Sequence, residues 1–477
     1  MIRDFSTAQQ LPSWDVCIAG AGPAGIAMAR ELAAAGLRVG LLEGGGLTYS
    51  EQSQRLYQVE STGMDLFAAS TRLRYFGGTS NHWSGRCRPF EADDFSRPPL
   101  GGLPGWPITF EEFDQYRPAA MRLLDLPAAG FQPLNAPLVG GRFEADPFAL
   151  SPPTRFAAKY LDELKASKHI DLVLNCNLVE VLFAAGTQSV AGFRVVNHQR
   201  QGAVAVAKNY VLAMGAIENV RLLLNSQALM AAGVGGPTLG KGFMEHLNVE
   251  FGTFVSAEAD APQGRQYFAG EVYSKQQSVG KGNVSFNVLS DIKSYGRTAE
   301  IKSFFKNLVC DLGLADKVQF ITRFDCPGSG VISTLLEQMP VLDGSHISLS
   351  NERDALGLQK AKVHWTLSAH DRRTVREVAL QVAKDFAESG LGFVKLHDYL
   401  LNPAAAIPVA PHAHHMGGTR MAAHQRDGVV NPDARVFGAN NLYVAGSSVF
   451  ATGGGGNPTM PLLQLALRLA KHLSNRG

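Results

Sequence analysis

Two short apolar runs near the start of the chain flank a glycine-rich turn and an alanine-rich segment. Residues 14–19 (WDVCIA) and 37–42 (LRVGLL) have the largely apolar character of buried parallel strands. Between them, GAGPAG over residues 20–25 leads into a predicted helix over 26–35, which Gly36 ends. The order strand, glycine turn, helix, strand predicts a βαβ unit in a parallel sheet.

This βαβ unit carries the pattern of a dinucleotide site. Gly20 permits the tight turn, Gly22 lets a pyrophosphate approach the backbone, and Gly25 lets helix and strand pack closely. The helix N-terminus offers unpaired N–H groups and partial positive charge to the phosphates. Glu43 stands at the end of the second strand, where it can accept hydrogen bonds from a ribose. The residues expected to hold the dinucleotide here are Gly20, Gly22, Pro23, Ala24, Gly25 and Glu43.

The rest of the chain continues this alternation and then changes character. The elements expected between residues 150 and 250 are helices over 155–167 and 217–225 and strands over 170–175, 178–183 and 210–216. From about residue 249 to residue 400, alternating strands and polar loops predict a mostly β domain, with a long helix over 371–389. The expected fold class is α/β (α+β overall), with a Rossmann-like dinucleotide-binding domain and a mostly antiparallel β-sheet substrate domain.

Length, charge and cysteine content narrow the class of protein. The 477 residues exceed what one compact core holds, so at least two domains are expected. The net charge of +2 leaves no electrostatic footprint for nucleic acid, and no apolar run is long enough to cross a membrane. The N-terminus has no secretory pattern. The cysteines fit neither a zinc site nor a disulfide framework, so we expect reduced thiols and a cytoplasmic setting. They are Cys17, Cys87, Cys176, Cys310 and Cys326.

A segment rich in glycine and polar residues lies between the predicted strands. Residues 72–89 (RLRYFGGTSNHWSGRCRP) are too polar for a core element and predict an ordered loop close to a ligand. Residues 106–112 then predict a turn and a helix start. Thr109 would be the N-cap there, with Glu112 as its capping-box partner.

The last segment of the chain concentrates polar groups around glycine turns. Residues 412–420 (HAHHMGGTR) bring three histidines beside a glycine turn, and residues 441–446 predict a strand. The stretch TGGGGNPT over 452–459 leads into a helix over 460–472, with Pro458 in its first turn. A metal site has little support, because no carboxylate or cysteine stands nearby at ligand spacing.

These motifs together resemble the glucose–methanol–choline (GMC) oxidoreductases over most of the chain. The segments that carry the resemblance are GAGPAG, LLEGGG, YVLAMGAIENVRLLLNS (210–226), GKGFMEH (240–246), SHISLSNERDALG (345–357), HHMGGTRM (414–421) and NLYVAGSSVFATGGGGNPT (441–459). The resemblance implies FAD as the cofactor. It implies an FAD-binding domain over 1–248 with a flavin-contacting loop over 72–90, a substrate-binding domain over 249–410, and a C-terminal return over 411–477.

The resemblance also implies the reaction and its residues. The histidine of H-x-G-G-T, His415, would accept the hydroxyl proton, and Asn457 would orient the substrate oxygen while a hydride passes to flavin N5. The N-terminus of the last helix would stabilise the reduced flavin. His412 and His414 are expected to be ordinary surface or hydrogen-bonding residues, and His246 a structural one. Further expected flavin contacts are Gly77, Gly78, Thr79, Asn81, His82, Val179, Ala213, Gly446, Ser447, Pro458 and Thr459.

Several functional alternatives stay open at this point. The GGTSNHW stretch resembles the pyranose 2-oxidase and sugar dehydrogenase branch, where a histidine at this place can be joined covalently to the flavin, so His82 is either linked or an unlinked neighbour. That branch favours sugars or polyols as the hydroxyl-bearing substrate. The electron acceptor would be oxygen, a quinone or a carrier protein. A redox-neutral lyase of the same fold and a non-catalytic flavoprotein are the rivals.

Overall fold

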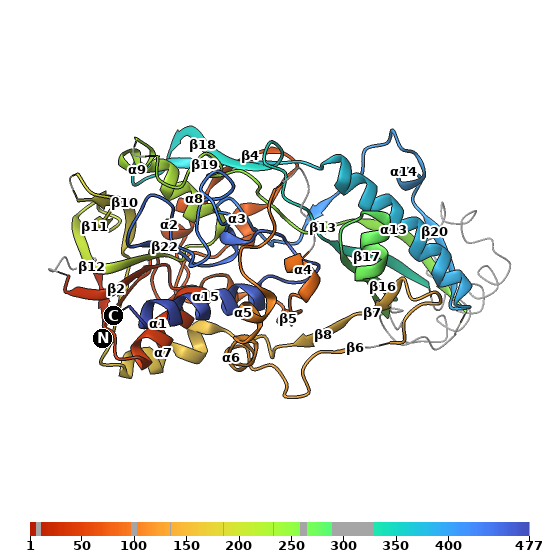
Figure 1. Cartoon of the computed structure of the whole chain (residues 1–477), viewed down its shortest axis with the longest axis horizontal. Coiled ribbons are helices and arrows are strands. Elements are labelled where there is room, and N and C mark those ends of the chain that lie inside the picture. The colour runs from red at the N-terminus through yellow and green to blue at the C-terminus, as the bar shows by residue number, and fades with distance from the viewer. Residues whose placement is uncertain are drawn as a thin grey trace, which may run out of the picture.

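The computed structural model describes most of the chain. Its described residues are 1–5, 11–96, 103–133, 135–184, 186–231, 233–257, 265–288 and 329–476. Two large sheets stand towards opposite ends of the long axis, with helices and loops between them (Figure 1). Cys310 and Cys326 lie outside the described residues, while the other three cysteines are buried and free.

The first sheet has a parallel core with an antiparallel edge. In spatial order its strands are β1 (Ile2–Asp4), β9 (Ile170–Leu174), β3 (Val39–Leu42), β2 (Ser13–Ala19), β12 (Gly202–Leu212), β11 (Val190–Val196) and β10 (Asn177–Phe183), and β22 (Leu442–Val444) also pairs with β12. All pairs are parallel except β10–β11 and β11–β12. Helices α1 (Pro23–Ala34) and α15 (Thr459–Ser474) run side by side below it (Figure 1). The start and the end of the chain therefore build one unit.

The second sheet is antiparallel throughout. In spatial order its strands are β20 (Gly392–Leu396), β14 (Glu250–Ser256), β17 (Ser329–Leu336), β16 (Gly282–Val288), β15 (Arg265–Ala269) and β7 (Phe143–Ala145). Strand β13 (Leu247–Asn248) also pairs with β17, and β21 (Ala410–Pro411) pairs with β13. Helix α13 (Ala369–Glu388) covers it, and Phe386 stacks on Phe286 with ring centroids 4.3 Å apart. The two sheets confirm the expected fold class.

Two small sheets join these units. They consist of β18 (His346–Arg353), β19 (Gln359–Trp365) and β4 (Val59–Gly63), and of β5 (Arg86–Cys87), β8 (Pro147–Leu150) and β6 (Gln132–Pro133). Helix α8 (Ala216–Asn225) packs on β18 and β19. Strand β7 precedes residue 248 in the sequence but belongs to the second sheet. Strand β19 follows residue 248 and pairs with β4, which precedes it. Sheet membership therefore crosses position 248, the first of the two positions at which we expect domain boundaries.

Shorter helices complete the described structure. They are α2 (Glu51–Gln54), η2 (Arg55–Tyr57), α3 (Ala68–Thr71), η3 (Gly78–Asn81), α4 (Ala92–Ser96), α5 (Phe110–Asp114), α6 (Arg117–Leu123), α7 (Phe156–Ala166), α9 (Gln227–Ala231), α10 (Glu271–Gln277), α14 (Asp398–Leu401) and η5 (Ser447–Val449). The capping box at Thr109 and Glu112 is present, as predicted. Pro458 is the N-cap residue of α15, one position earlier than its expected place in the first turn.

Candidate active site

A cavity of about 460 Å³ lies where the parallel strands end. Its wall is built from the β2–α1 turn, the end of β3, residues 71–84, the β12–α8 turn, and three pieces of the C-terminal segment. Those pieces are residues 412–415, 445–447 and 457–459. The carboxyl ends of parallel strands are where open α/β sheets bind their ligands. Segments far apart in the sequence thus meet around one space.

Three glycines shape the β2–α1 turn, each by a different constraint. Gly20 has a φ of 107°, and a Cβ there would lie 2.4 Å from the carbonyl oxygen of Ala213. A Cβ on Gly25 would lie 1.9 Å from the carbonyl oxygen of Gly20, so Gly25 allows the helix to sit on the strand. A Cβ on Gly22 would meet no atom within 4 Å. The space at Gly22 belongs to the cavity, directly before the N-terminus of α1.

Glu43 closes this part of the cavity. Its side chain is buried and accepts hydrogen bonds from the backbone N–H groups of Ala21 (3.0 Å) and Gly45 (2.8 Å). Burial raises the pKa of this carboxyl group, although the backbone donors oppose the change. Each carboxylate oxygen has a second lone pair. The group therefore braces the turn and can still accept a hydrogen bond from a ribose.

The glycine-rich loop packs directly on the β2–α1 turn. The N–H of Gly77 donates to the carbonyl oxygen of Ala21 (2.9 Å), and a Cβ on Gly78 would lie 3.1 Å from Cα of Gly22. Both glycines have positive φ, 91° and 53°. Asn81 donates from Nδ2 to the carbonyl oxygen of Phe76 (2.9 Å), so its side chain braces the loop.

The structure brings most of the expected site residues to this cavity. Those lining it are Gly20, Gly22, Pro23, Ala24, Glu43, Gly78, Thr79, His82, Ala213, His415, Gly446, Ser447, Asn457, Pro458 and Thr459. Gly25, Gly77, Asn81 and Val179 are not among the lining residues. The first three shape the turn or the loop, and Val179 follows the lining residue Leu178 on β10.

A row of hydrogen bonds crosses the wall of the cavity beside α15. Asn457 Nδ2 lies 3.1 Å from His414 Nε2, and His414 Nδ1 lies 2.8 Å from His246 Nδ1. His246 Nε2 lies 2.8 Å from the carbonyl oxygen of Gly454. Burial lowers the pKa of His246 to about 3, and burial together with the neighbouring histidines lowers the pKa of His414 well below its ordinary value. Both rings are therefore neutral near pH 7.

The Gly454 end of this row fixes where every proton lies. A carbonyl oxygen can only accept, so His246 must carry its proton on Nε2 and present a lone pair on Nδ1. His414 must then donate from Nδ1, which leaves the lone pair of its Nε2 free to accept from the Asn457 amide. The row ends at the cavity with an unprotonated imidazole nitrogen beside an amide donor. That pairing suits removal of a hydroxyl proton.

His415 is oriented differently. Its Nε2 lies 3.8 Å from Oε2 of the buried Glu245, its ring centroid lies 6.1 Å from that of Phe243, and burial lowers its pKa to about 3. The motif predicted His415 beside Asn457, but the structure brings His414 there instead. The two adjacent side chains point to different surroundings, because His414 contacts Asn457 and His246 whereas His415 lies near Glu245 and Phe243. No local pattern in the sequence distinguishes His414 from His415 as the neighbour of Asn457.

His412 and Glu245 support this arrangement. The ring of His412 stacks on that of His414 with centroids 5.7 Å apart, and its Nε2 lies 2.6 Å from the carbonyl oxygen of Thr334. Glu245 accepts the backbone N–H of His414 on both carboxylate oxygens, at 2.8 and 2.9 Å. Burial raises the pKa of Glu245 to about 8, although the hydrogen bonds from the backbone lower it in part. Both ring nitrogens of His246 and His414 and the Nε2 of His412 make hydrogen bonds within the protein, whereas the buried Nε2 of His415 has no hydrogen-bond partner among the described residues.

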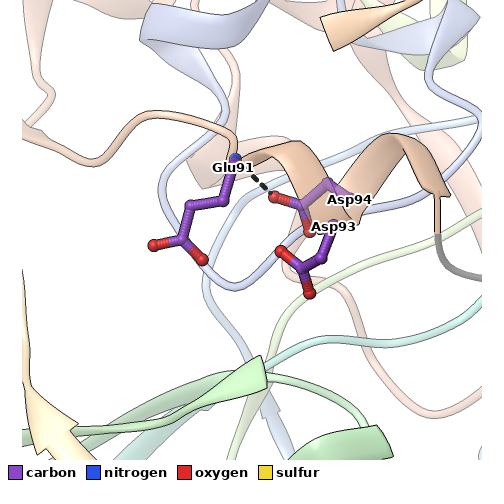
Figure 2. A group of neighbouring side chains, drawn as sticks. All are labelled: Glu91, Asp93 and Asp94. Atoms are coloured by element: carbon purple, nitrogen blue, oxygen red, sulfur yellow. Dashed lines mark hydrogen bonds between the residues drawn. The ribbon is translucent and has the colours of Figure 1, made fainter. Parts of the chain in front are cut away.

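Glu91, Asp93 and Asp94 form an acidic cluster (Figure 2). The backbone carbonyl of Asp94 accepts a hydrogen bond from Thr452 at the start of the glycine loop that precedes Asn457. Lys281 Nζ contacts Asp93 and lies 3.0 Å from Asp94 Oδ1 and 3.2 Å from Glu91 Oε2. Burial opposes the charge on this lysine, yet the carboxylates raise its pKa to about 12. Lys281 thus occupies the place that a cation would take. A Cβ on Gly455 would lie 3.1 Å from Cβ of Lys281, so the cluster supports that loop.

Replacing Lys281 with methionine should destabilise the protein by about 3 kcal/mol near pH 7, because the buried Asp93 carboxylate loses its ion pair with the lysine. Burial already raises the pKa of Asp93, and losing the lysine raises it further. A raised carboxyl pKa in the folded state favours folding at low pH, so the deficit should shrink as the pH falls from about 7 to about 5. Urea unfolding at both pH values measures this.

Lys275, in an exposed pair with Glu271, provides the matched control. Its change to methionine should cost less than about 0.5 kcal/mol at either pH. Equal losses for the two lysine variants would contradict this account of the cluster.

Comparison with known proteins yields two family matches. Residues 342–466 match a model described as GMC oxidoreductase, and residues 15–250 match one described as FAD dependent oxidoreductase. The first match contains His414 and Asn457, and the second contains the β2–α1 turn and Glu43. Together the two matches include Asn457, His414, His246 and Gly454, which form the hydrogen-bonded row.

Relatives of known activity align over different shares of their length. The chain is 31% identical over 123 residues to a C-glycoside 3-oxidase of Microbacterium trichothecenolyticum, which is 26% of this chain and 22% of that protein. It is 23% identical over 451 residues to a C-glycoside 3-oxidase of Arthrobacter globiformis, which is 90% of this chain and 78% of that protein. The chain thus spans less than a quarter of the first relative.

A solved structure shares the fold. Pyridoxine 4-oxidase from Mesorbium loti superposes with a TM-score of 0.60 at 18% identity, covering 96% of this chain and 98% of that one. In the part of the chain that the structure describes, no helix is long and apolar enough to cross a membrane.

Proposed function

This chain belongs to the GMC oxidoreductase family, and we propose that it uses FAD to oxidise a hydroxyl group of a sugar, polyol or other alcohol to a carbonyl. The observation that carries the proposal is the unprotonated Nε2 of His414 beside the Asn457 amide, facing the cavity. His414 takes the role of base that the motif predicted for His415.

The cavity residues fit FAD. The open space at Gly22 before the N-terminus of α1 suits the pyrophosphate, and the buried Glu43 carboxylate suits a ribose. Ser447 and the start of α15 at Thr459 line the same cavity on the side of Asn457. When bound, FAD supplies the two-electron acceptor for the hydride. The protein's own residues then have to hold the alcohol and remove its proton.

His414 and Asn457 divide that work. His414 Nε2 accepts the hydroxyl proton, so that the oxygen becomes negative as its carbon gives up the hydride. The Asn457 amide, released from His414, donates to the same oxygen and sets its angle. One proton and one hydride leave the substrate, and a C=O bond forms.

The substrate class is the finer part of the proposal. The names of relatives point to hydroxyl groups on sugar-like or small polar molecules, and Trp83, Ser84 and His412 line the same cavity as His414. The electron acceptor is oxygen, a quinone or a carrier protein. An anaerobic panel of a C-glycoside, other sugars, polyols, amino sugars, pyridoxine and aryl alcohols tests this. Flavin that bleaches with one class identifies it, while flavin that stays oxidised with all of them favours the lyase or the non-catalytic flavoprotein.

The burial of His414 determines how the rate of flavin reduction depends on pH. Because its pKa lies well below its ordinary value, the neutral base is fully populated near neutrality and stays so on mild acidification. We expect the rate of flavin reduction at saturating substrate to stay constant within about twofold from about pH 7.5 to about pH 5.5. Anaerobic stopped-flow measurements check this. A rate that falls with an apparent pKa near that of free histidine would contradict the assignment.

His82 is part of the proposal in two forms, covalently linked to FAD or next to it. It lines the cavity, and burial lowers its pKa, so its imidazole is neutral. Acid precipitation separates the two forms. A linked flavin stays yellow in the pellet and is released by His82→Ala, whereas an unlinked flavin stays in solution in both proteins.

A further inference from the structure

His246 is the innermost side chain of the hydrogen-bonded row. It is 0% exposed, and both of its ring nitrogens are used, Nε2 towards Gly454 and Nδ1 towards His414. It does not line the cavity. A contact with substrate is therefore not its role, and its effect has to pass through His414.

The backbone around His246 holds the row at fixed distances. Glu245 accepts the backbone N–H of His246 at 2.7 Å, and the same carboxylate accepts the backbone N–H of His414. Gly454 is held from the other side, because its N–H donates to Glu337 Oε1 at 2.9 Å. His246, His414 and the Gly454 carbonyl are thus three fixed points. The order of donors and acceptors along the row cannot be reversed, since it ends on a carbonyl oxygen.

We propose that His246 is a positioning residue, which keeps the proton of His414 on Nδ1 and so leaves Nε2 free to act as the base. The inference rests on the proposed function of His414, and it adds a reason why that histidine is active in one tautomer. An isolated imidazole exchanges its proton between the two nitrogens, and the partner of one nitrogen decides the state of the other. Without an acceptor at Nδ1, His414 can place its proton on Nε2, where it blocks proton removal.

Two replacements separate the hydrogen bond from the bulk of the ring. His246→Leu removes the acceptor and keeps an apolar side chain of similar size. His246→Asn keeps an acceptor, because its side-chain oxygen reaches about the place of Nδ1. His364 provides the matched control, since its Nδ1 makes a 3.1 Å hydrogen bond to Thr62 Oγ1 away from the cavity. His364→Leu loses a histidine hydrogen bond without touching the row.

The first test needs no substrate. Nitrogen NMR of the ¹⁵N-histidine-labelled holoenzyme should show His414 protonated on Nδ1 in the wild type, in His246→Asn and in His364→Leu, and on Nε2 in a large fraction of His246→Leu. An unchanged Nδ1 proton in His246→Leu would overturn the proposal. This readout does not depend on turnover, so it can fail independently of the proposed function. The proposed function itself fails if no substrate of the panel reduces the flavin of the wild-type protein.

The second test uses anaerobic flavin reduction with a C-glycoside or, where the panel selects another substrate, that one. His246→Leu should lower the limiting reduction rate by about 10²-fold with little change in substrate dissociation constant, and His246→Asn should recover most of the rate. In a His414→Ala background, His246→Leu should cost nothing more, because it acts through His414. The proposal would be overturned if His246→Leu lowered the reduction rate by the same factor in the wild type and in His414→Ala, or if His246→Leu alone kept the wild-type rate.

Discussion

Replacing His414 with alanine is expected to lower the limiting rate of flavin reduction by about 10²–10⁴-fold. The change removes the unprotonated Nε2 that lies 3.1 Å from the Asn457 amide, and no other described histidine makes a hydrogen bond to that amide. FAD content should stay close to that of the wild type, because the residues that fit the phosphates and ribose lie on other elements. Anaerobic stopped-flow spectroscopy measures the rate, and absorbance ratios measure the FAD content.

His415→Ala is the informative comparison for this variant. His415 faces Glu245 and Phe243 rather than Asn457, so its loss should lower the rate far less than the loss of His414. A large loss in His415→Ala with a nearly normal rate in His414→Ala would return the role of base to His415. It would show that the row through His246 has no part in proton removal.

Gly22→Ala should weaken FAD binding while leaving the apoprotein stable. The backbone at Gly22, with φ of −82° and ψ of −172°, suits alanine, and the added Cβ meets no protein atom within 4 Å. The methyl group would instead occupy the space proposed for the pyrophosphate. We expect FAD affinity to fall by about 10²-fold. Fluorescence titration of the apoprotein with FAD measures the affinity, and thermal unfolding of the apoprotein should be unchanged.

Gly25→Ala, three residues on, should behave in the opposite way. Its Cβ would lie 1.9 Å from the backbone oxygen of Gly20, so the helix has to move from the strand and the apoprotein loses stability. If Gly22→Ala instead bound FAD normally, the pyrophosphate would not lie at this turn.

Local patterns in the sequence were sufficient to predict the frame of the site. The glycines at 20, 22 and 25 and the acid at 43 predict a βαβ unit because their backbone and charge requirements are local, and the structure forms it from Ser13 to Leu42. The capping box at Thr109 and Glu112 is local in the same sense. The alternating polar pattern after residue 249 predicted the antiparallel sheet.

Contacts between distant segments could not be predicted in this way. Strand β7 pairs with β15, more than a hundred residues later, and no local pattern indicates that pairing. The choice between His414 and His415 depends on which of the two side chains meets Asn457 and on a hydrogen bond between His414 and His246, 168 positions away. Lys281, directly before β16, reaches the acidic cluster from 188 positions beyond Asp93, and no local pattern indicates this pairing.

The most direct test of the central claim is a single-turnover titration of the holoenzyme without oxygen. The alcohol or sugar selected by the panel is added in steps, and the flavin absorbance and the carbonyl product are measured together. The account predicts one equivalent of carbonyl product for each flavin reduced, with the flavin fully bleached. A carbonyl product formed while the flavin stays oxidised, or no change with any hydroxyl compound, would contradict it.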